Sequence, residues 1–118
     1  MRHRERDKFK IDKTKQRIFE RDHCKCQHPG CCESAVELAH CVGQGENQIG
    51  ITKTMWNIEF KEQRNYRFIE VHVIHNDLNM SASCSRHNSY FNIGNDPGKV
   101  LEKLKEIRKN LIQTGVIK

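Results

Sequence analysis

Residues 26–31 read CQHPGC and residues 84–87 read CSRH, and these two short stretches decide the fold. A Pro-Gly turn in the first stretch brings the sulfurs of Cys26 and Cys31 back together. Cys84 and His87 stand at the spacing of a second pair of ligands. Three thiolates and one imidazole are an ordinary tetrahedral zinc set, so the sequence predicts a structural Cys3His zinc site that joins two distant segments. On spacing alone, three nearby side chains are alternative ligands: Cys24, Cys32 and His28.

The composition explains why such a site is needed. A chain of 118 residues, 36% hydrophobic and 31% charged, has room for one domain with a small hydrophobic core. A domain with so small a core usually requires a staple, that is, a disulfide, a bound metal or a partner chain that stabilises the fold. Five of the six cysteines lie between residues 24 and 41, too crowded for a disulfide framework. No apolar run has the length of a membrane span, and no secretory signal follows the basic start. We therefore expect reduced thiolates on a metal, in a soluble protein of a cytoplasm-like compartment.

The net charge of +6 is unevenly distributed along the chain. Residues 1–25 carry +5 and residues 97–118 carry +4, whereas residues 26–96 carry −3. Basic ends around an acidic centre are typical of a protein that grips a polyanion with its flanks, and nucleic acid is the natural candidate. The alternative is that these charges are solvated helix faces that keep the protein soluble.

The apolar patterning predicts an α+β fold in a single domain over residues 1–118. We expect a basic arm and a helix over 1–22 with Asp12 as its cap, a cysteine knuckle and core over 24–92, and an amphipathic helix over 97–114. Within the core the pattern predicts strands at 36–42 and 68–74, a turn at 76–79 and a short helix at 83–92. Residues 46–66 fit neither period. Trp56 and Phe60 are expected in the core rather than on a base-stacking surface, and the apolar stripe of the last helix is expected to pack inside the molecule.

Once the two zinc knuckles are placed, the remaining motif residues follow a recognisable order. Leu38-Ala39-His40 lies between the knuckles, the run from Asn79 to Asn88 contains the second knuckle, and Phe91-Asn92 follows it. In this order the chain resembles the HNH endonucleases over about residues 17–92. The resemblance implies a zinc-stapled ββα-metal core in an H-N-N variant. It also implies similarity to small stand-alone HNH proteins of phages and mobile elements, at work in the cytoplasm of a bacterium or an infected cell.

The resemblance further implies a metal-dependent cleavage of DNA. His40 would be the general base that deprotonates the water attacking the scissile phosphate, and an imidazole titrating near 6.5 is largely free base at neutral pH. Asn79 would hold the loop and His40 in register. Asn88 and Asn92 would bind Mg²⁺ or another divalent ion. Four basic residues are the expected DNA contacts: Arg17, Arg21, Lys25 and Arg86.

Two features depart from the family pattern and leave alternatives open. Ala39 stands where many members carry an acidic metal ligand, so a further ligand has to come from another residue. The candidates are Asn92, His72, His75 and Asp77. The long interval from His40 to Asn79 indicates an insertion over 44–66 that forms a DNA-contacting loop or hairpin. The alternative function is a non-catalytic zinc-knuckle protein that binds nucleic acid, and in either case a packaging or restriction protein is an expected partner.

Overall fold

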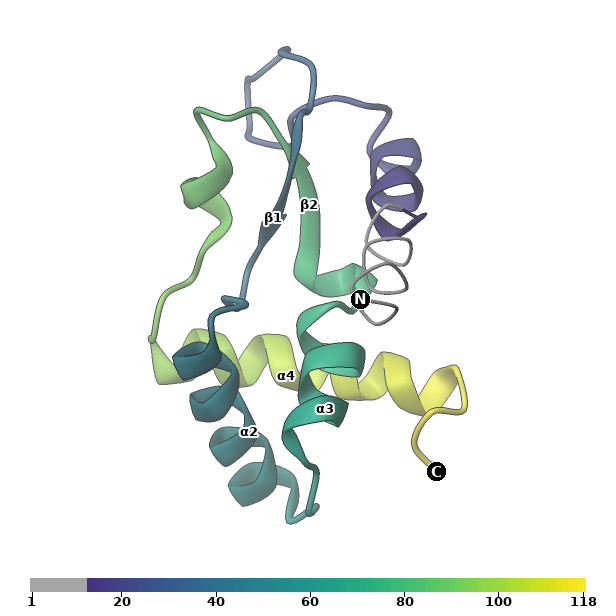
Figure 1. Ribbon diagram of the computed structural model, residues 1–118, viewed down its shortest axis with the longest axis vertical. Helices are drawn as coiled ribbons and strands as arrows, with labels where there is room; N and C mark the ends of the chain where they lie inside the picture. The colour runs from purple at the N-terminus through teal and green to yellow at the C-terminus, as the bar shows by residue number, and fades with distance from the viewer. Residues whose placement is uncertain (1–12) are drawn as a thin grey trace, which may run out of the picture. The chain divides into compact units, whose positions relative to one another are not determined.

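The computed structural model describes residues 13–118, which form helices and a two-stranded sheet (Figure 1). The α+β class is therefore confirmed. The elements in chain order are a helix over 13–21, β1 (Glu37–His40), α2 (Glu46–Phe60), α3 (Tyr66–Phe68), a π-helical segment (Ile69–Ile74), a 3₁₀ turn (Asp77–Asn79), β2 (Met80–Ser83), a 3₁₀ turn (Asn88–Phe91) and α4 (Pro97–Gln113). The expected basic arm and the Asp12 cap lie outside the described residues. Within 13–118, no helix combines the length and the apolar character that crossing a membrane requires.

The described residues fall into two compact units, and the division lies inside both strands. Unit 1 comprises residues 13–39 with Ser81–Phe91, and unit 2 comprises His40–Met80 with Asn92–Lys118. β1 and β2 pair directly with each other (Figure 1). The Val36 N–H donates to Ser83 O at 2.9 Å, and the Cys41 N–H donates to Asn79 O at 2.9 Å. The residue numbers run in opposite directions along this ladder, so the strands are antiparallel.

Unit 1 is built from the first helix, the cysteine-rich loop and most of the sheet. Ile18 is the fully buried residue of the helix. The helix ends where His23 and Cys24 both adopt a φ of 57°, which forms a left-handed cap. Next to this cap, the carboxylate of Asp22 accepts a hydrogen bond from the Ala82 N–H at 2.9 Å. The end of the helix is thereby joined to β2, the strand that precedes the second knuckle.

Unit 2 holds the main hydrophobic core. α2, α4 and the π-helical segment pack together, with Trp56 fully buried among them. The buried residues of α4 repeat at helical spacing: Val100, Leu104, Ile107 and Leu111. Asp96 caps α4 by accepting a hydrogen bond from the Lys99 N–H at 3.2 Å. The expected helix over 97–114 and the core position of Trp56 are confirmed. Of the expected apolar stripe these four residues are buried, whereas Ile112 is 42% exposed.

Three segments of the chain meet at one edge of unit 2. The Cys41 N–H donates to Asn79 O at 2.9 Å, and the Ile93 N–H donates to Cys41 O at 3.0 Å. These residues stand next to the points where the chain enters or leaves unit 2, at His40, Met80 and Asn92. Backbone hydrogen bonds thus connect the three chain segments at which unit 2 begins or ends.

The strand expected over 68–74 is wrong, because these residues are helical. Their apolar and polar residues alternate, which is typical of a strand. In the structure Ile69, Val73 and Ile74 are buried, and this spacing belongs to one face of a helix. Asn65 starts the helical turn, since its side chain accepts a hydrogen bond from the Phe68 N–H at 2.8 Å. The packing against α2 and α4 therefore overrides the strand preference of the β-branched residues.

Two further expectations are corrected. The inserted segment over 44–66 is not a loop or hairpin, because most of it is α2. That helix buries only Ile49, Thr52 and Trp56, so its sequence shows little amphipathic pattern. The short helix expected over 83–92 is only the 3₁₀ turn Asn88–Phe91, and the preceding residues Met80–Ser83 form β2. The second strand of the sheet thus lies directly before the second knuckle.

Candidate functional site

Unit 1 brings together the four side chains that the sequence predicts as zinc ligands. The ligand atoms of Cys26, Cys31, Cys84 and His87 all lie within 4.8 Å of one another. Hydrogen bonds position both knuckles: the Cys31 N–H donates to His28 O at 3.0 Å, and the His87 N–H donates to Cys84 O at 3.3 Å. Within residues 13–118 this is the one group of three or more His, Cys, Asp or Glu side chains with such spacing. The group can hold a metal ion such as zinc.

The distances in the cluster fit a tetrahedral ion. Zn–S bonds of about 2.3 Å and Zn–N bonds of about 2.0 Å place a sulfur and a nitrogen about 3.6 Å apart. The Nδ1 atom of His87 lies 3.8 Å from Cys26 Sγ and 3.3 Å from Cys84 Sγ. Both distances lie close to the required separation, so the His87 ring nitrogen is placed to share an ion with these two sulfurs.

The electrostatics of the cluster favour a thiolate. Burial raises the pKa of the Cys26 thiol, but hydrogen bonds from the backbone of Cys84 and His28 and from the His87 ring outweigh it, and the pKa falls to about 6. Burial raises the pKa of the Cys84 thiol. One member of the pair is therefore ionised at neutral pH, and the thiolate is the form of cysteine that binds metals.

The alternative ligands suggested by spacing lie outside this cluster. Cys24 and Cys32 are exposed free thiols. The ring of His28 stacks on the ring of His87, with 3.9 Å between centroids and 12° between planes, and Tyr90 packs edge-on against His28. His28 thus supports the ring of a cluster residue and is not itself a member.

His40 ends β1 and lies beside a second histidine of unit 2. Its Nε2 atom is 3.4 Å from Nδ1 of His75. Burial, together with the neighbouring His75, lowers the pKa of His40 to about 4. His40 is therefore a neutral imidazole at neutral pH. The sequence suggests His75 as a structural or DNA-contact residue and, alternatively, as an ion ligand, and it carries no signal that pairs His75 with His40, because the contact is long-range.

Asn79 is fully buried, and its amide group forms hydrogen bonds with the backbone of Val42, two residues after His40. We call this pair of hydrogen bonds to Val42 the clasp. The Oδ1 of Asn79 accepts from the Val42 N–H at 2.8 Å, and its Nδ2 donates to Val42 O at 3.1 Å and to Ile74 O at 2.8 Å. The amide is fully occupied by the backbone, so Asn79 positions the loop that follows β1.

The two asparagines expected to bind the divalent ion lie in different surroundings. In unit 1, Nδ2 of Asn88 donates to the Glu37 carboxylate at 2.7 Å. In unit 2, Oδ1 of Asn92 accepts from the Gly94 N–H at 2.6 Å. Asn92 lies beyond the 3₁₀ turn Asn88–Phe91, so the two asparagines do not share a helix.

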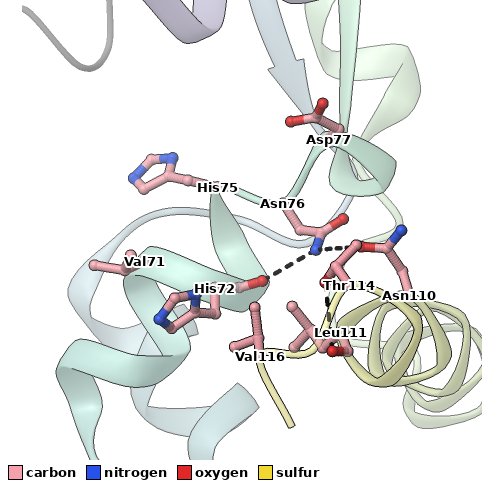
Figure 2. A pocket seen from close by; sticks show the side chains of 9 residues that line it. All are labelled: Val71, His72, His75, Asn76, Asp77, Asn110, Leu111, Thr114 and Val116. Atoms are coloured by element: carbon pink, nitrogen blue, oxygen red, sulfur yellow. Dashed lines mark hydrogen bonds between the residues drawn. The ribbon is translucent and has the colours of Figure 1, made fainter.

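The other candidate ion ligands, His72, His75 and Asp77, line a pocket of unit 2 (Figure 2). Asn76 crosses this pocket, donating from Nδ2 to His72 O at 3.2 Å and to Asn110 Oδ1 at 3.3 Å. The remaining lining residues shown in Figure 2 are Val71, Leu111, Thr114 and Val116. Among the residues that the structure describes, these side chains do not gather into a three-ligand cluster.

The four expected DNA contacts all lie in unit 1. Arg21 forms an ion pair with Asp22 at 2.9 Å, and Arg86 forms one with Glu33 at 2.7 Å. Arg17 and Lys25 are exposed. Because the Arg86 pair is largely exposed and therefore weak, phosphate oxygens can replace its partner at little cost.

The low pKa of His40 makes unit 2 sensitive to acid. An unfolded imidazole titrates near 6.5 and the folded one near 4, so the unfolded chain binds the proton first. We expect the free energy of unfolding to decrease as the pH falls from about 6.5 to about 4, and the decrease from this group to level off below that. Burial also lowers the pKa of His75, which contributes in the same direction. Urea denaturation at several pH values, followed by the fluorescence of Trp56, the single tryptophan, measures this dependence.

The matched variants are His40→Gln and, at an exposed position, His23→Asn. His40→Gln should flatten the pH dependence and His23→Asn should keep it. An unchanged slope in His40→Gln would contradict the attribution to His40.

Comparison with protein-family models, with curated proteins and with solved structures finds no match to this chain. Function is therefore inferred from the side chains and their geometry alone.

Proposed function

We propose that the protein is a zinc-stapled, HNH-like endonuclease that hydrolyses DNA phosphodiester bonds with the help of a divalent ion. The observation that carries the proposal is the clasp of Asn79 on Val42, because it fixes the chain immediately after His40, as expected for a catalytic histidine at a strand end. The antiparallel pair β1 and β2 around this point supports a ββα-metal core. The basic ends of the sequence supply the affinity for DNA.

In this proposal the Cys3His cluster binds one structural Zn²⁺. The cluster combines thiolate and imidazole ligands, and this donor set is typical of closed structural zinc sites. The four side chains come from two chain segments that flank β1 and β2, so the metal stabilises unit 1 and takes no part in the reaction.

His40 is the proposed general base. Its ring is neutral at neutral pH because its pKa lies near 4, so a nitrogen is open to a proton from the attacking water, although the same low pKa makes the ring a weaker base than an ordinary imidazole. Asn88 would supply an amide oxygen for the divalent ion, and Glu37, which accepts a hydrogen bond from Asn88 Nδ2 at 2.7 Å, would supply an anionic oxygen in place of an acid at Ala39. When bound, such an ion stabilises the negative charge that develops on the phosphate oxygens.

The test is the cleavage of supercoiled plasmid in the presence of Mg²⁺ or Mn²⁺, with EDTA as the metal-free control. We expect metal-dependent nicked or linear DNA, and a loss of at least about 100-fold in rate for His40→Ala. The zinc bound at the Cys3His cluster and the DNA affinity of that variant should stay unchanged. His23→Asn, at an exposed position in unit 1, is the matched histidine control and should cleave like the original chain.

A second function is favoured by one specific observation. Ala39 is fully buried and has no side-chain donor, so the usual acidic ligand is missing from β1. A binding protein without catalysis would shift the plasmid on a gel in a salt-dependent manner and yield no product with any metal. That result would replace the nuclease with a zinc-knuckle protein that binds nucleic acid.

A further inference from the structure

The ring of His40, at the end of β1, contacts the ring of His75, which follows the π-helical segment, and the nuclease proposal does not use this contact. His40 Nε2 and His75 Nδ1 lie 3.4 Å apart, and the ring planes cross at 77°. Both side chains are half-buried in unit 2. Among residues 13–118 neither ring makes another hydrogen bond, so the two nitrogens face each other without competing partners.

The distance between these nitrogens is that of a long hydrogen bond, and it also suits two ligands of one shared ion. Hydrogen bonds from N–H groups cluster at about 2.9–3.0 Å. Two nitrogens on one tetrahedral ion, each about 2.0–2.1 Å from the metal, are about 3.3–3.4 Å apart. The observed 3.4 Å matches the second arrangement.

We infer that His40 and His75 form a second metal site, which takes a late first-row transition ion such as Zn²⁺, Ni²⁺ or Co²⁺ through Nε2 of His40 and Nδ1 of His75. Neutral imidazoles are the usual ligands for these ions, whereas Mg²⁺ prefers oxygen ligands. Two protein ligands leave the remaining positions of the ion to water or to an anion. The site therefore binds more weakly than the Cys3His cluster and exchanges its ion with solution.

This inference stands on the two rings and does not require the nuclease. It has one consequence that rests on the proposed function. A nitrogen of His40 that holds an ion cannot accept a proton, so a transition ion at this pair and general-base catalysis by His40 exclude each other. Cleavage supported by Mg²⁺ would then be inhibited by added Zn²⁺.

The test uses the full chain with its first equivalent of Zn²⁺ already bound, and titrates further Zn²⁺ by calorimetry. The original chain should bind about one additional equivalent. His40→Ala and His75→Ala should each weaken this second binding by at least tenfold. His72→Ala, in the same helical segment, is the matched control and should bind the second equivalent normally.

NMR of the histidine rings in the original chain tests the same site without substitutions, so its result does not depend on whether the variants fold. Two-bond ¹H–¹⁵N NMR spectra of the original chain should show the second equivalent shifting the resonances of His40 Nε2 and His75 Nδ1, while those of His23 and His72 stay in place. Absence of a second equivalent, or its binding without a change at these two rings, would overturn the site. Neither result depends on DNA cleavage, so failure of the site and failure of the nuclease are distinguishable. The same titration with Mg²⁺ should show no binding at the pair.

Discussion

Cys84→Ser is expected to unfold unit 1, whereas Cys32→Ser leaves it folded. Cys84 is 4% exposed and belongs to the Cys3His cluster, and Cys32 is an exposed thiol next to Cys31 outside the cluster. Structural zinc sites contribute apparent binding free energies of about 10–16 kcal/mol at neutral pH. A whole domain is usually stable by only about 5–15 kcal/mol. Because unit 1 has a small apolar core, the binding free energy lost with one ligand is expected to exceed the free energy of unfolding of the unit.

Cobalt provides a direct measurement of this difference. Co²⁺ in place of Zn²⁺ should give the visible absorption bands of a tetrahedral thiolate site in the original chain and in Cys32→Ser, and weak or no bands in Cys84→Ser. Circular dichroism then reports the lost secondary structure. Cys41→Ser, in unit 2, is a second control and should behave like Cys32→Ser. Folded Cys84→Ser protein beside unfolded Cys41→Ser protein would show that the ligand set is wrong.

Asn79→Ala is expected to lower the free energy of unfolding of unit 2 by about 3–5 kcal/mol. The substitution leaves three buried backbone groups without partners, namely the N–H and C=O of Val42 and the C=O of Ile74. Each unsatisfied buried group costs about 1–3 kcal/mol, and the cavity left by the amide adds to the loss. Urea denaturation followed by the fluorescence of Trp56 measures the change in the unit that contains both residues.

Two further variants show whether the amide itself is responsible. Asn79→Asp keeps the shape and the acceptor of the side chain but places oxygen beside the Val42 and Ile74 carbonyls, so it should destabilise unit 2 at least as strongly as alanine. Asn92→Ala removes an exposed asparagine with a single local hydrogen bond, and its effect should stay below about 1 kcal/mol. A change below about 1 kcal/mol in Asn79→Ala would refute the clasp.

The parts of the structure that depend on local spacing could be predicted from the sequence. The four cluster residues were identified because a metal needs its ligands at short intervals around turns, and α4 was identified because its apolar residues repeat at helical spacing. The segment 68–74 could not be assigned, since its alternating β-branched residues suit a strand and only its neighbours in the core make it helical. The pairing of His40 with His75 joins two segments through tertiary structure, which no single-sequence pattern records.

The backbone contacts among Cys41, Asn79 and Ile93 also bear on how this chain can change over evolution. Residues 42–78 depart from one point and return to the same point, because Cys41 and Asn79 are bonded to each other. Lengthening such a closed segment costs little entropy, since each doubling of a flexible loop adds only about 0.6 kcal/mol. Insertions in the short connection between α2 and α3, which leave the buried core residues of these helices in place, therefore need not disturb the strand register or the spacing of the two knuckles. The helices of the segment are less free to change, because Trp56, Ile69 and Val73 are fully buried in the core of unit 2.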